Sequence, residues 1–132
     1  MCEEMLGCWK LISSEGFDVY MKALGVDMGT RILVSPLKPD VIISKNGDDW
    51  CIKTVSSLKT TDLCFILNKE FDEDTADKRK CKTIFKLNDG KLIQTQKWDG
   101  KESIITRQVQ NGQLITDCIC DDAKCHRVYE KK

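Results

Sequence analysis

The chain has 132 residues, and its 21 basic side chains are balanced by 21 acidic ones. This length suits one domain over residues 1–132, and the absence of a basic excess argues against a nucleic-acid partner. The acidic N-terminal segment, residues 1–7, has the wrong charge for a signal peptide, and no apolar run is long enough to span a membrane. These features predict a cytoplasmic protein, with the nucleus left open as a further compartment.

Eight cysteines are many for a chain of this length. In a secreted protein they would suggest a disulfide framework, but without a signal peptide we expect free thiols that pack as small apolar residues. They are Cys2, Cys8, Cys51, Cys64, Cys81, Cys118, Cys120 and Cys125.

The first part of the chain predicts one strand and two short helices. Residues 6–12 alternate loosely and suit a strand. Residues 13–14 offer a serine N-cap, apolar residues then recur at helical spacing, and Gly25 suits the end of this helix. Asp27 suits the N-cap of a second helix, which the following proline should end near Ser35.

From Lys38 onward, short apolar segments alternate with turn signals. Asn-Gly and Asp-Gly pairs suit two-residue hairpins because both central residues tolerate positive φ. The signals are Asn46-Gly47, Asp89-Gly90, Asp99-Gly100, Asn111-Gly112 and Asp121-Asp122. This spacing predicts an antiparallel meander of about nine further strands, closed into a barrel and capped by the helix pair. The charged run at residues 77–80 suits a solvated turn.

The last hairpin places unusual side chains on one face of the sheet. With a two-residue turn at 121–122, the opposed pairs are Leu114 with Tyr129, Thr116 with Arg127 and Cys118 with Cys125. The other face carries most of the formal charge, so alternation favours this face as the inward one.

Alternation also places Arg107, Gln94 and Gln96 on inward faces of the preceding strands. A buried charge without a partner is costly, so such an interior should be wet and should offer its cations to an anion. In the competing interpretation, Arg107 and Arg127 merely pair with carboxylates such as Glu102 or Asp117.

The thiols of the last hairpin leave two states open. Cys118 and Cys125 are opposed, with β-carbons about 4.5–5.5 Å apart, so they could form a disulfide. Two reduced thiols lining the cavity suit a cytoplasmic protein better. No metal site is expected from these cysteines with Cys120 and His126, because His126 points to the other face.

Several segments of this chain resemble one known family. They are Gly7–Leu11, Phe17–Lys22, Val41–Asp48, Thr75–Lys80, Gln96–Glu102 and Arg127–Glu130. The chain resembles, from end to end, the intracellular fatty-acid-binding proteins, and most closely their adipocyte and myelin P2 branch. The resemblance implies a mostly β fold of the lipocalin-like, or calycin, type: a ten-stranded, antiparallel up-and-down β-barrel (β-clam) closed by a helix-turn-helix lid.

The resemblance also implies a function. It implies a monomeric carrier without cofactor, metal or catalytic residues, which binds a long-chain fatty acid reversibly in the barrel. The ligand carboxylate would be held by Arg107, Arg127 and Tyr129 through charge-assisted hydrogen bonds. Transient membrane contact through the helical lid is a further expectation, although Ile32 replaces a basic residue of the lid.

The resemblance and the alternation together predict the residues along the ligand tail and at the portal. They are Phe17, Met21, Pro39, Trp50, Ile52, Thr54, Leu58, Ala76, Asp77, Gln96, Thr116 and Cys118. Trp50 stands where relatives have a smaller aliphatic residue and could shorten the cavity. Leu58 replaces a phenylalanine that commonly gates the portal.

Two other functions use the same features. Retinoic acid or another hydrophobic carboxylate would suit the same anchor, and a membrane-apposing role like that of myelin P2 would use the lid. An enzymatic role is not expected, because the sequence shows no Ser-His-Asp or Cys-His arrangement and no metal-ligand or phosphate-binding motif.

Overall fold

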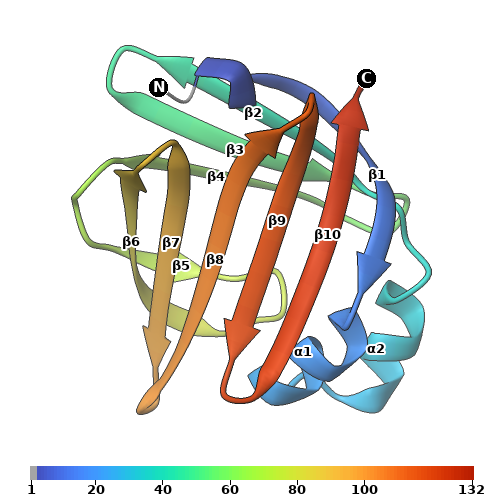
Figure 1. Cartoon of the computed structure of the whole chain (residues 1–132). Helices are drawn as coiled ribbons and strands as arrows, with labels where there is room; N and C mark the ends of the chain where they lie inside the picture. Colours follow the sequence, from blue (N-terminus) through green and yellow to red (C-terminus); the bar gives the residue numbers. More distant parts are fainter. Residues whose placement is uncertain (1–2) are drawn as a thin grey trace.

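The computed structural model describes residues 3–132, in which ten strands form one antiparallel sheet curled into a nearly closed barrel. Consecutive strands pair except β4 with β5, and β1 also pairs with β10 (Figure 1). The strands are β1 (Gly7–Glu15), β2 (Asp40–Asn46), β3 (Asp49–Val55), β4 (Thr60–Ile66), β5 (Phe71–Asp74), β6 (Lys80–Asn88), β7 (Lys91–Trp98), β8 (Lys101–Gln110), β9 (Gln113–Cys120) and β10 (Ala123–Lys131). The predicted barrel and its number of strands are confirmed.

Most of the predicted turns have the backbone that their dipeptides require. Both residues of Asp89-Gly90, Asp99-Gly100 and Asn111-Gly112 have φ between 44° and 76°, as two-residue hairpin turns demand. The Asn46-Gly47 prediction is wrong by one residue, because Asn46 pairs with Asp49 and the turn consists of Gly47 and Asp48.

Two helices, α1 (Phe17–Leu24) and α2 (Met28–Val34), lie at one end of the barrel beside the β9–β10 turn (Figure 1). The predicted caps at Gly25 and Asp27 are confirmed. Gly25 ends α1 with φ 95°, and the Asp27 carboxylate accepts a 3.1 Å hydrogen bond from the backbone N–H of Thr30. These caps fix the sharp reversal between the two helices.

The N-cap predicted at residues 13–14 is wrong. β1 continues through these serines to Glu15, because they pair with Val128 and Arg127 of β10. Helix α1 instead begins after Gly16, whose φ is 75°. A β-carbon on Gly16 would lie 2.1 Å from the backbone oxygen of Lys124, so only glycine fits between the lid and β10.

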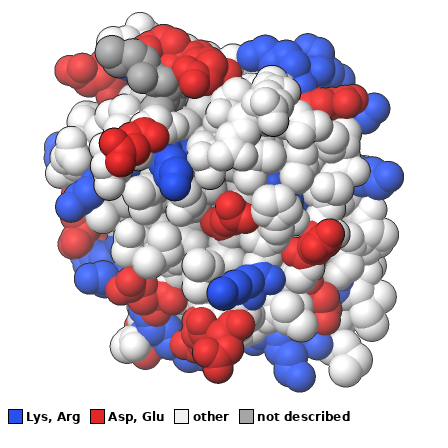
Figure 2. Space-filling model, in the orientation of Figure 1, with Lys and Arg blue, Asp and Glu red and all other residues white. Residues whose placement is uncertain are grey.

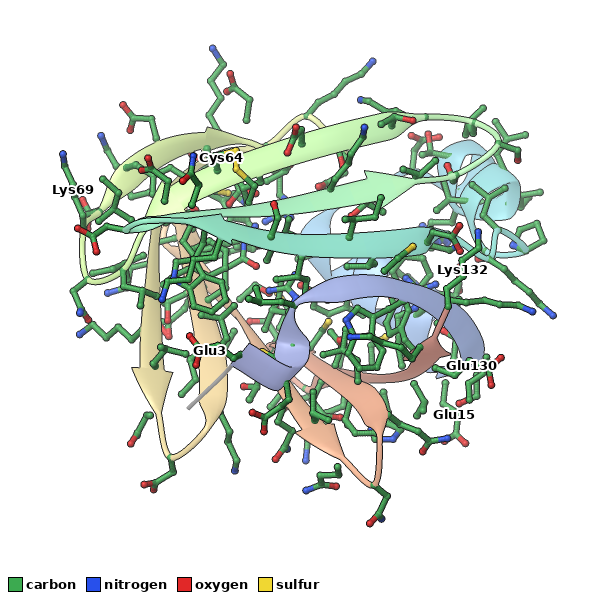
Figure 3. All side chains as sticks on the ribbon, turned by 90° about the horizontal axis from the view of Figure 1, so that it is seen from above. Glu3, Glu15, Cys64, Lys69, Glu130 and Lys132 are labelled. Atoms are coloured by element: carbon green, nitrogen blue, oxygen red, sulfur yellow. A yellow bond between two sulfur atoms is a disulfide. The ribbon has the colours of Figure 1, made fainter. Side chains whose placement is uncertain are left out.

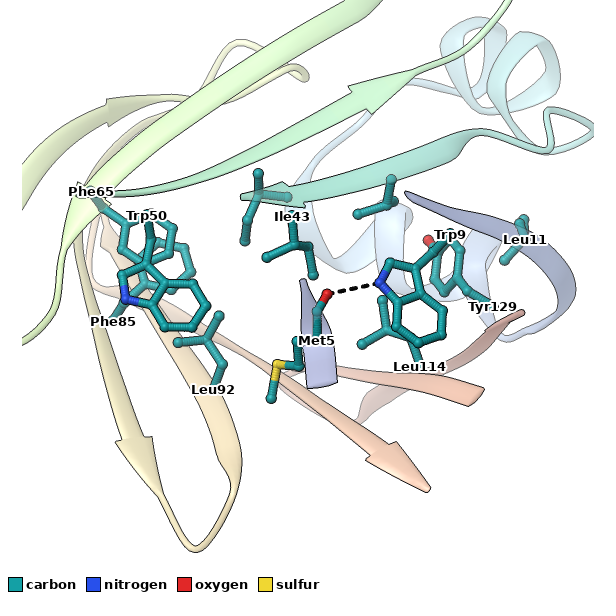
Figure 4. Packing of buried hydrophobic residues seen from close by; sticks show 12 residues of the cluster. Met5, Trp9, Leu11, Ile43, Trp50, Phe65, Phe85, Leu92, Leu114 and Tyr129 are labelled. Carbon is teal, nitrogen blue, oxygen red and sulfur yellow. Dashed lines mark hydrogen bonds between the residues drawn. The ribbon is translucent and has the colours of Figure 1, made fainter. Parts of the chain in front are cut away.

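Apolar side chains fill the end of the barrel opposite the lid, where a short 3-10 helix, η1 (Glu3–Met5), closes it (Figures 1 and 4). Met5 is fully buried, and its backbone oxygen accepts a 2.8 Å hydrogen bond from Nε1 of Trp9. Phe65 lies between two aromatic rings, with its centroid 6.4 Å from that of Trp50 and 3.5 Å from that of Phe85. We call the members of this cluster that do not line the cavity the floor: Met5, Trp9, Leu11, Ile43, Trp50, Phe65, Phe85, Leu92 and Leu114.

A second cluster seats α1 on β9 and β10. Tyr20 and Leu24 of α1 pack against Cys118, Cys120 and Cys125. All three cysteines are free and buried, so they pack as small apolar residues, as predicted. The predicted opposition of Cys118 and Cys125 is confirmed by the register of the hairpin.

One pair of cysteines departs from the prediction of free thiols. Cys51 of β3 and Cys64 of β4 are opposed in the sheet and form a disulfide (Figure 3). Cys8 and Cys81 are free thiols, as predicted. Cys2, which was also predicted to be free, lies outside the described residues.

The outer surface carries acidic and basic side chains interspersed with one another over the face in view (Figure 2). This mixture agrees with the balanced composition. Among residues 3–132, no helix has the length and apolar character that crossing a membrane would require.

Candidate functional site

A cavity of about 460 Å³ lies inside the barrel between the lid and the floor. This volume falls within the range of pockets that hold small organic ligands. All the residues predicted along the ligand tail and portal line it except Trp50. The lining includes Phe17, Met21, Pro39, Ile52, Thr54, Leu58, Ala76, Asp77, Gln96, Thr116 and Cys118, together with Arg107, Arg127 and Tyr129.

Trp50 points inward, as predicted, but it does not line the cavity. It is 2 % exposed and belongs to the floor, where it stacks on Phe65. Its effect on the ligand is therefore indirect, because it fills space that a longer cavity would occupy.

Arg107 enters the cavity from β8. Its Nη1 donates a 2.9 Å hydrogen bond to Oε1 of Gln94. Burial lowers the pKa of Arg107, since a low-dielectric surrounding disfavours the charged form. Burial has cost this guanidinium its favourable interactions with water. An anion bound beside it would compensate for that loss.

Arg127 enters the cavity from β10, opposite Thr116 of β9. Its side chain is buried, and its Nε has no hydrogen-bond partner. The guanidinium carbon lies 4.0 Å from the ring centroid of Phe17, at the start of α1. This contact offsets part of the cost of burying the charge, but it leaves the Nε–H donor unused.

Tyr129 follows Arg127 at the next inward position of β10 and also lines the cavity. Burial raises the pKa of Tyr129, so its hydroxyl remains a neutral donor. The guanidinium groups of Arg107 and Arg127 and the phenol of Tyr129 therefore line the same cavity.

The competing interpretation, in which the two arginines pair with nearby carboxylates, is wrong for the described residues. Within residues 3–132, no ion pair joins Arg107 or Arg127 to Glu102 or Asp117. Asp117 instead lies 2.6 Å from Nδ1 of His126 on the exposed face. Two cations thus line the cavity without a carboxylate partner.

The buried carboxylate of Glu73, on β5, accepts hydrogen bonds from side chains of β6 and β7. Its Oε1 accepts hydrogen bonds from Thr83 Oγ1 at 2.7 Å, Gln94 Nε2 at 3.2 Å and Gln96 Nε2 at 3.0 Å. Because Gln94 also accepts from Arg107, the position of Arg107 is fixed through Gln94 by Glu73. Gln94 and Gln96 lie inward, as predicted, whereas Glu73 was not predicted as a cavity residue.

Arg79 is a third arginine of the cavity. It was not predicted there, because the charged run at residues 77–80 was assigned to a solvated turn. It forms two hydrogen bonds with Asp77, at 2.5 Å and 3.1 Å, and its guanidinium carbon lies 4.4 Å from the Trp98 ring centroid. Partial burial raises the pKa of Asp77, but the hydrogen bonds and the charge of Arg79, together with a hydrogen bond from Thr75, outweigh it and hold this pKa below its ordinary value. Arg79 is thus already paired, unlike Arg127.

The opposed thiols of Cys118 and Cys125 lie close enough to interact. A hydrogen bond from Cys118 to Cys125 lowers the pKa of Cys125 and raises that of Cys118, and burial raises the pKa of Cys118 further. Both remain free rather than bridged, which is the state favoured on the sequence.

The arrangement suits binding of a carboxylate with an apolar tail rather than catalysis. The cavity combines Arg107 and Arg127, which form no ion pair among the described residues, with apolar lining from Met21, Leu24 and Ile52. The chain has one histidine, and its side chain is on the exposed face, bonded to Asp117. No nucleophile–base pair therefore faces the cavity in the described part of the chain.

A model of the family described as "Lipocalin / cytosolic fatty-acid binding protein family" matches residues 6–132. The chain is 49% identical to the adipocyte fatty acid-binding protein of Pygoscelis papua over 131 residues, 99% of each chain. It is 52% identical to fatty acid-binding protein 5 of the same species over 130 residues, 98% of this chain and 97% of that one. A solved structure of a Schistosoma mansoni fatty acid binding protein in complex with arachidonic acid superposes with a TM-score of 0.94, at 32% identity, over 99% of this chain and 98% of that one.

Proposed function

The chain belongs to the lipocalin / cytosolic fatty-acid binding protein family, and we propose that it carries long-chain fatty acids reversibly in its barrel, with the carboxylate held by Arg107, Arg127 and Tyr129. The relatives are fatty-acid-binding carriers rather than enzymes, and one of them is solved with arachidonic acid bound. These relatives support the ligand class, whereas the anchor rests on the geometry of this cavity.

One observation carries the proposal. The Nε–H of Arg127 is buried without a hydrogen-bond partner and belongs to a side chain that lines the cavity. A buried donor without a partner costs about 1–3 kcal/mol, and more when the group is charged. A carboxylate bound here would remove that cost.

The two ends of a fatty acid meet different surfaces in this cavity. The carboxylate forms charge-assisted hydrogen bonds, which are roughly twice as strong as neutral ones. The acyl chain leaves water for the apolar lining, which contributes about 0.8 kcal/mol per buried methylene. The head group therefore sets the orientation, and the tail supplies most of the affinity.

The test is oleate binding by Arg127→Gln. The variant should bind oleate roughly 10- to 150-fold more weakly, which corresponds to the loss of about 1.5–3 kcal/mol for a hydrogen bond to a charged group. Isothermal titration calorimetry measures the affinity, and thermal unfolding checks that the barrel stays folded.

Arg79→Gln is the matched control, since Arg79 also lines the cavity but is already paired with Asp77. It should weaken oleate binding much less than Arg127→Gln does. Equal affinity in Arg127→Gln and the parent, or equal losses in the two variants, would refute the anchor.

The exposed lid supports a second proposal, transient contact with membranes during ligand transfer. Met28, Ile32 and Leu33 of α2 are 65%, 66% and 62% exposed, and such a helix suits shallow insertion at a membrane interface. Transfer of a fluorescent fatty acid to vesicles should speed up with vesicle concentration, and a rate independent of that concentration would exclude contact. We propose that the protein acts in this way as a monomer in the cytoplasm.

A further inference from the structure

The outer face of the β3–β4 ladder carries three potential metal ligands. Cys51 and Cys64 are directly opposed across the two strands, while their neighbours Trp50 and Phe65 point into the floor. Asp62 precedes Cys64 by two residues, so its side chain lies on the same outer face. Figure 3 shows the sulfur atoms of this pair at the label of Cys64.

These three side chains lie next to one another on the outer face. One carboxylate oxygen of Asp62 and the sulfur atoms of Cys51 and Cys64 all lie within 4.8 Å of one another, and Asp62 Oδ1 is 3.9 Å from Cys64 Sγ. Asp62 and Cys64 are exposed, and Cys51 is half-buried. An ion in solution can therefore reach the group without entering the barrel.

The chemistry of the group depends on its redox state. In the disulfide, both sulfur atoms are bonded to each other and neither is a thiolate. After reduction, two thiolates and one carboxylate provide the sulfur and oxygen ligands that a zinc-class cation accepts, at about 2.0–2.3 Å, with a fourth position left for water. The disulfide and a bound ion therefore exclude each other.

The strands that carry this group differ in how firmly the sheet holds them. β3 lies between β2 and β4, whereas β4 is an edge of the sheet with no ladder to β5 in the described barrel. Reduction lets the two sulfur atoms separate, and an edge strand can adjust because hydrogen bonds hold it on one side only. Cys51 is the fixed ligand, and Cys64 and Asp62 move together on the same strand.

We propose that reduced Cys51 and Cys64, together with Asp62, form an external site for a thiophilic divalent cation of the zinc class. A dithiol reductant transfers two electrons to the disulfide; its S–S bond breaks, each sulfur takes one proton, and the reductant becomes a disulfide. Binding of the cation then releases the two thiol protons, because thiolates are the ligands. Exchange with an added disulfide re-forms the S–S bond: the two thiolates lose two electrons, the added disulfide takes up these electrons and two protons to become two thiols, and the ion is released.

The test uses Cd²⁺ alone as the probe, added to the full chain after reduction with a phosphine. Thiolate-to-cadmium absorption should reach a plateau at one equivalent in the reduced parent and should be lacking in the oxidised parent. Cys51→Ser/Cys64→Ser should lose this binding. Cys118→Ser/Cys125→Ser, which removes the other opposed pair, should keep it.

The carboxylate ligand has its own matched control. Asp62→Asn should weaken Cd²⁺ binding at least about tenfold, since loss of even an outer partner of a metal ligand costs about 10- to 100-fold. Asp49→Asn removes an equal charge from the start of β3, two residues before Cys51, and should weaken binding clearly less, because Asp49 does not belong to the group of three ligands. Circular dichroism confirms that each variant is folded.

Several results would overturn this site. They are undiminished binding in Cys51→Ser/Cys64→Ser, loss of binding in Cys118→Ser/Cys125→Ser, and equal affinities in Asp62→Asn and Asp49→Asn. Equal binding of Cd²⁺ by the oxidised and the reduced parent would also overturn it, because the disulfide offers no thiolate and the ion would then be held by other cysteines.

Discussion

At the scale of single residues, the cavity contains three arginines in different electrostatic states. Arg79 is paired with Asp77, Arg107 is held by the neutral Gln94, and Arg127 keeps an unused donor. An incoming carboxylate gains most beside the cations that lack a negative partner. The head group should therefore lie at Arg107 and Arg127, away from Arg79.

The pair of Asp77 and Arg79 predicts a pH-dependent stability. The pKa of Asp77 is depressed in the folded state, so the pair stabilises the protein above the unfolded pKa of about 3.9, and this contribution is lost as pH falls through the folded pKa. Asp77→Asn should therefore be less stable than the parent at pH 7, and the difference should shrink below about pH 4. Urea unfolding at several pH values measures this difference.

A double variant isolates the cause of that effect. In the background of Arg79→Gln, the substitution Asp77→Asn should lose most of its pH-dependent cost, because the partner is already absent. A cost that stays the same at every pH, or that persists without Arg79, would show that the carboxylate acts through other neighbours.

The inward faces of Arg127 and Tyr129 were predicted correctly, whereas that of Arg79 was not, and the reason is local geometry. Arg127 and Tyr129 lie in a regular hairpin, so counting from the turn gives their face correctly. Arg79 follows Lys78, which has φ 71°, and this left-handed residue breaks the alternation on which such counting depends. Glu73 was missed because a charged residue in a short strand is usually solvated.

At the scale of elements, the connection between β1 and α1 decides how the lid sits. Gly16 has φ 75°, and a β-carbon there would collide with the backbone of β10, whereas Gly25 has φ 95° and nothing within 4 Å of such an atom. The first glycine is required by backbone conformation and by space. The second is required by conformation alone.

Alanine substitutions should separate these two requirements. Gly25→Ala should cost about 1–2 kcal/mol, the penalty of a left-handed backbone for a residue with a β-carbon. Gly16→Ala should cost clearly more, because the lid must also move away from Lys124. Denaturant unfolding of the two variants makes the comparison, and equal losses would mean that the lid tolerates this displacement freely.

Most turns, and the cross-strand pairing of the last hairpin, were readable from the sequence, whereas strand ends and pairings without such a turn were not. Asp-Gly and Asn-Gly pairs report local backbone conformation, which depends on few distant contacts. The serines at 13–14 offer a helix cap locally, but pairing with β10 keeps them in β1. The Cys51–Cys64 pairing was missed because the β3–β4 connection, residues 56–59, contains no Asn-Gly or Asp-Gly signal from which to count the register.

At the scale of the whole molecule, the barrel is divided between a packed floor and an open cavity. Trp50 stacks with Phe65 in the floor, and Phe65 stacks with Phe85. The cavity is lined instead by the lid and by strand residues between the lid and the floor. The size of the floor therefore limits how far an acyl chain can extend.

Trp50→Ala should extend the cavity into the space that the floor now fills. It should destabilise the barrel by about 3–5 kcal/mol, as removal of a large buried aromatic usually does, and it should shift relative affinity toward longer fatty acids. Trp50→Phe keeps an aromatic ring in the stack and should change both properties less. A chain-length preference that is identical in Trp50→Ala and the parent would show that the floor does not limit the ligand.

The most direct measurement is a crystal structure of the protein with oleate. The proposed anchor predicts a carboxylate oxygen within about 3 Å of Arg127 Nε, with Arg107 and Tyr129 also in contact and the tail directed away from them along the apolar lining. A carboxylate lying at the portal beside Lys59, with Arg127 Nε still without a partner, would contradict it.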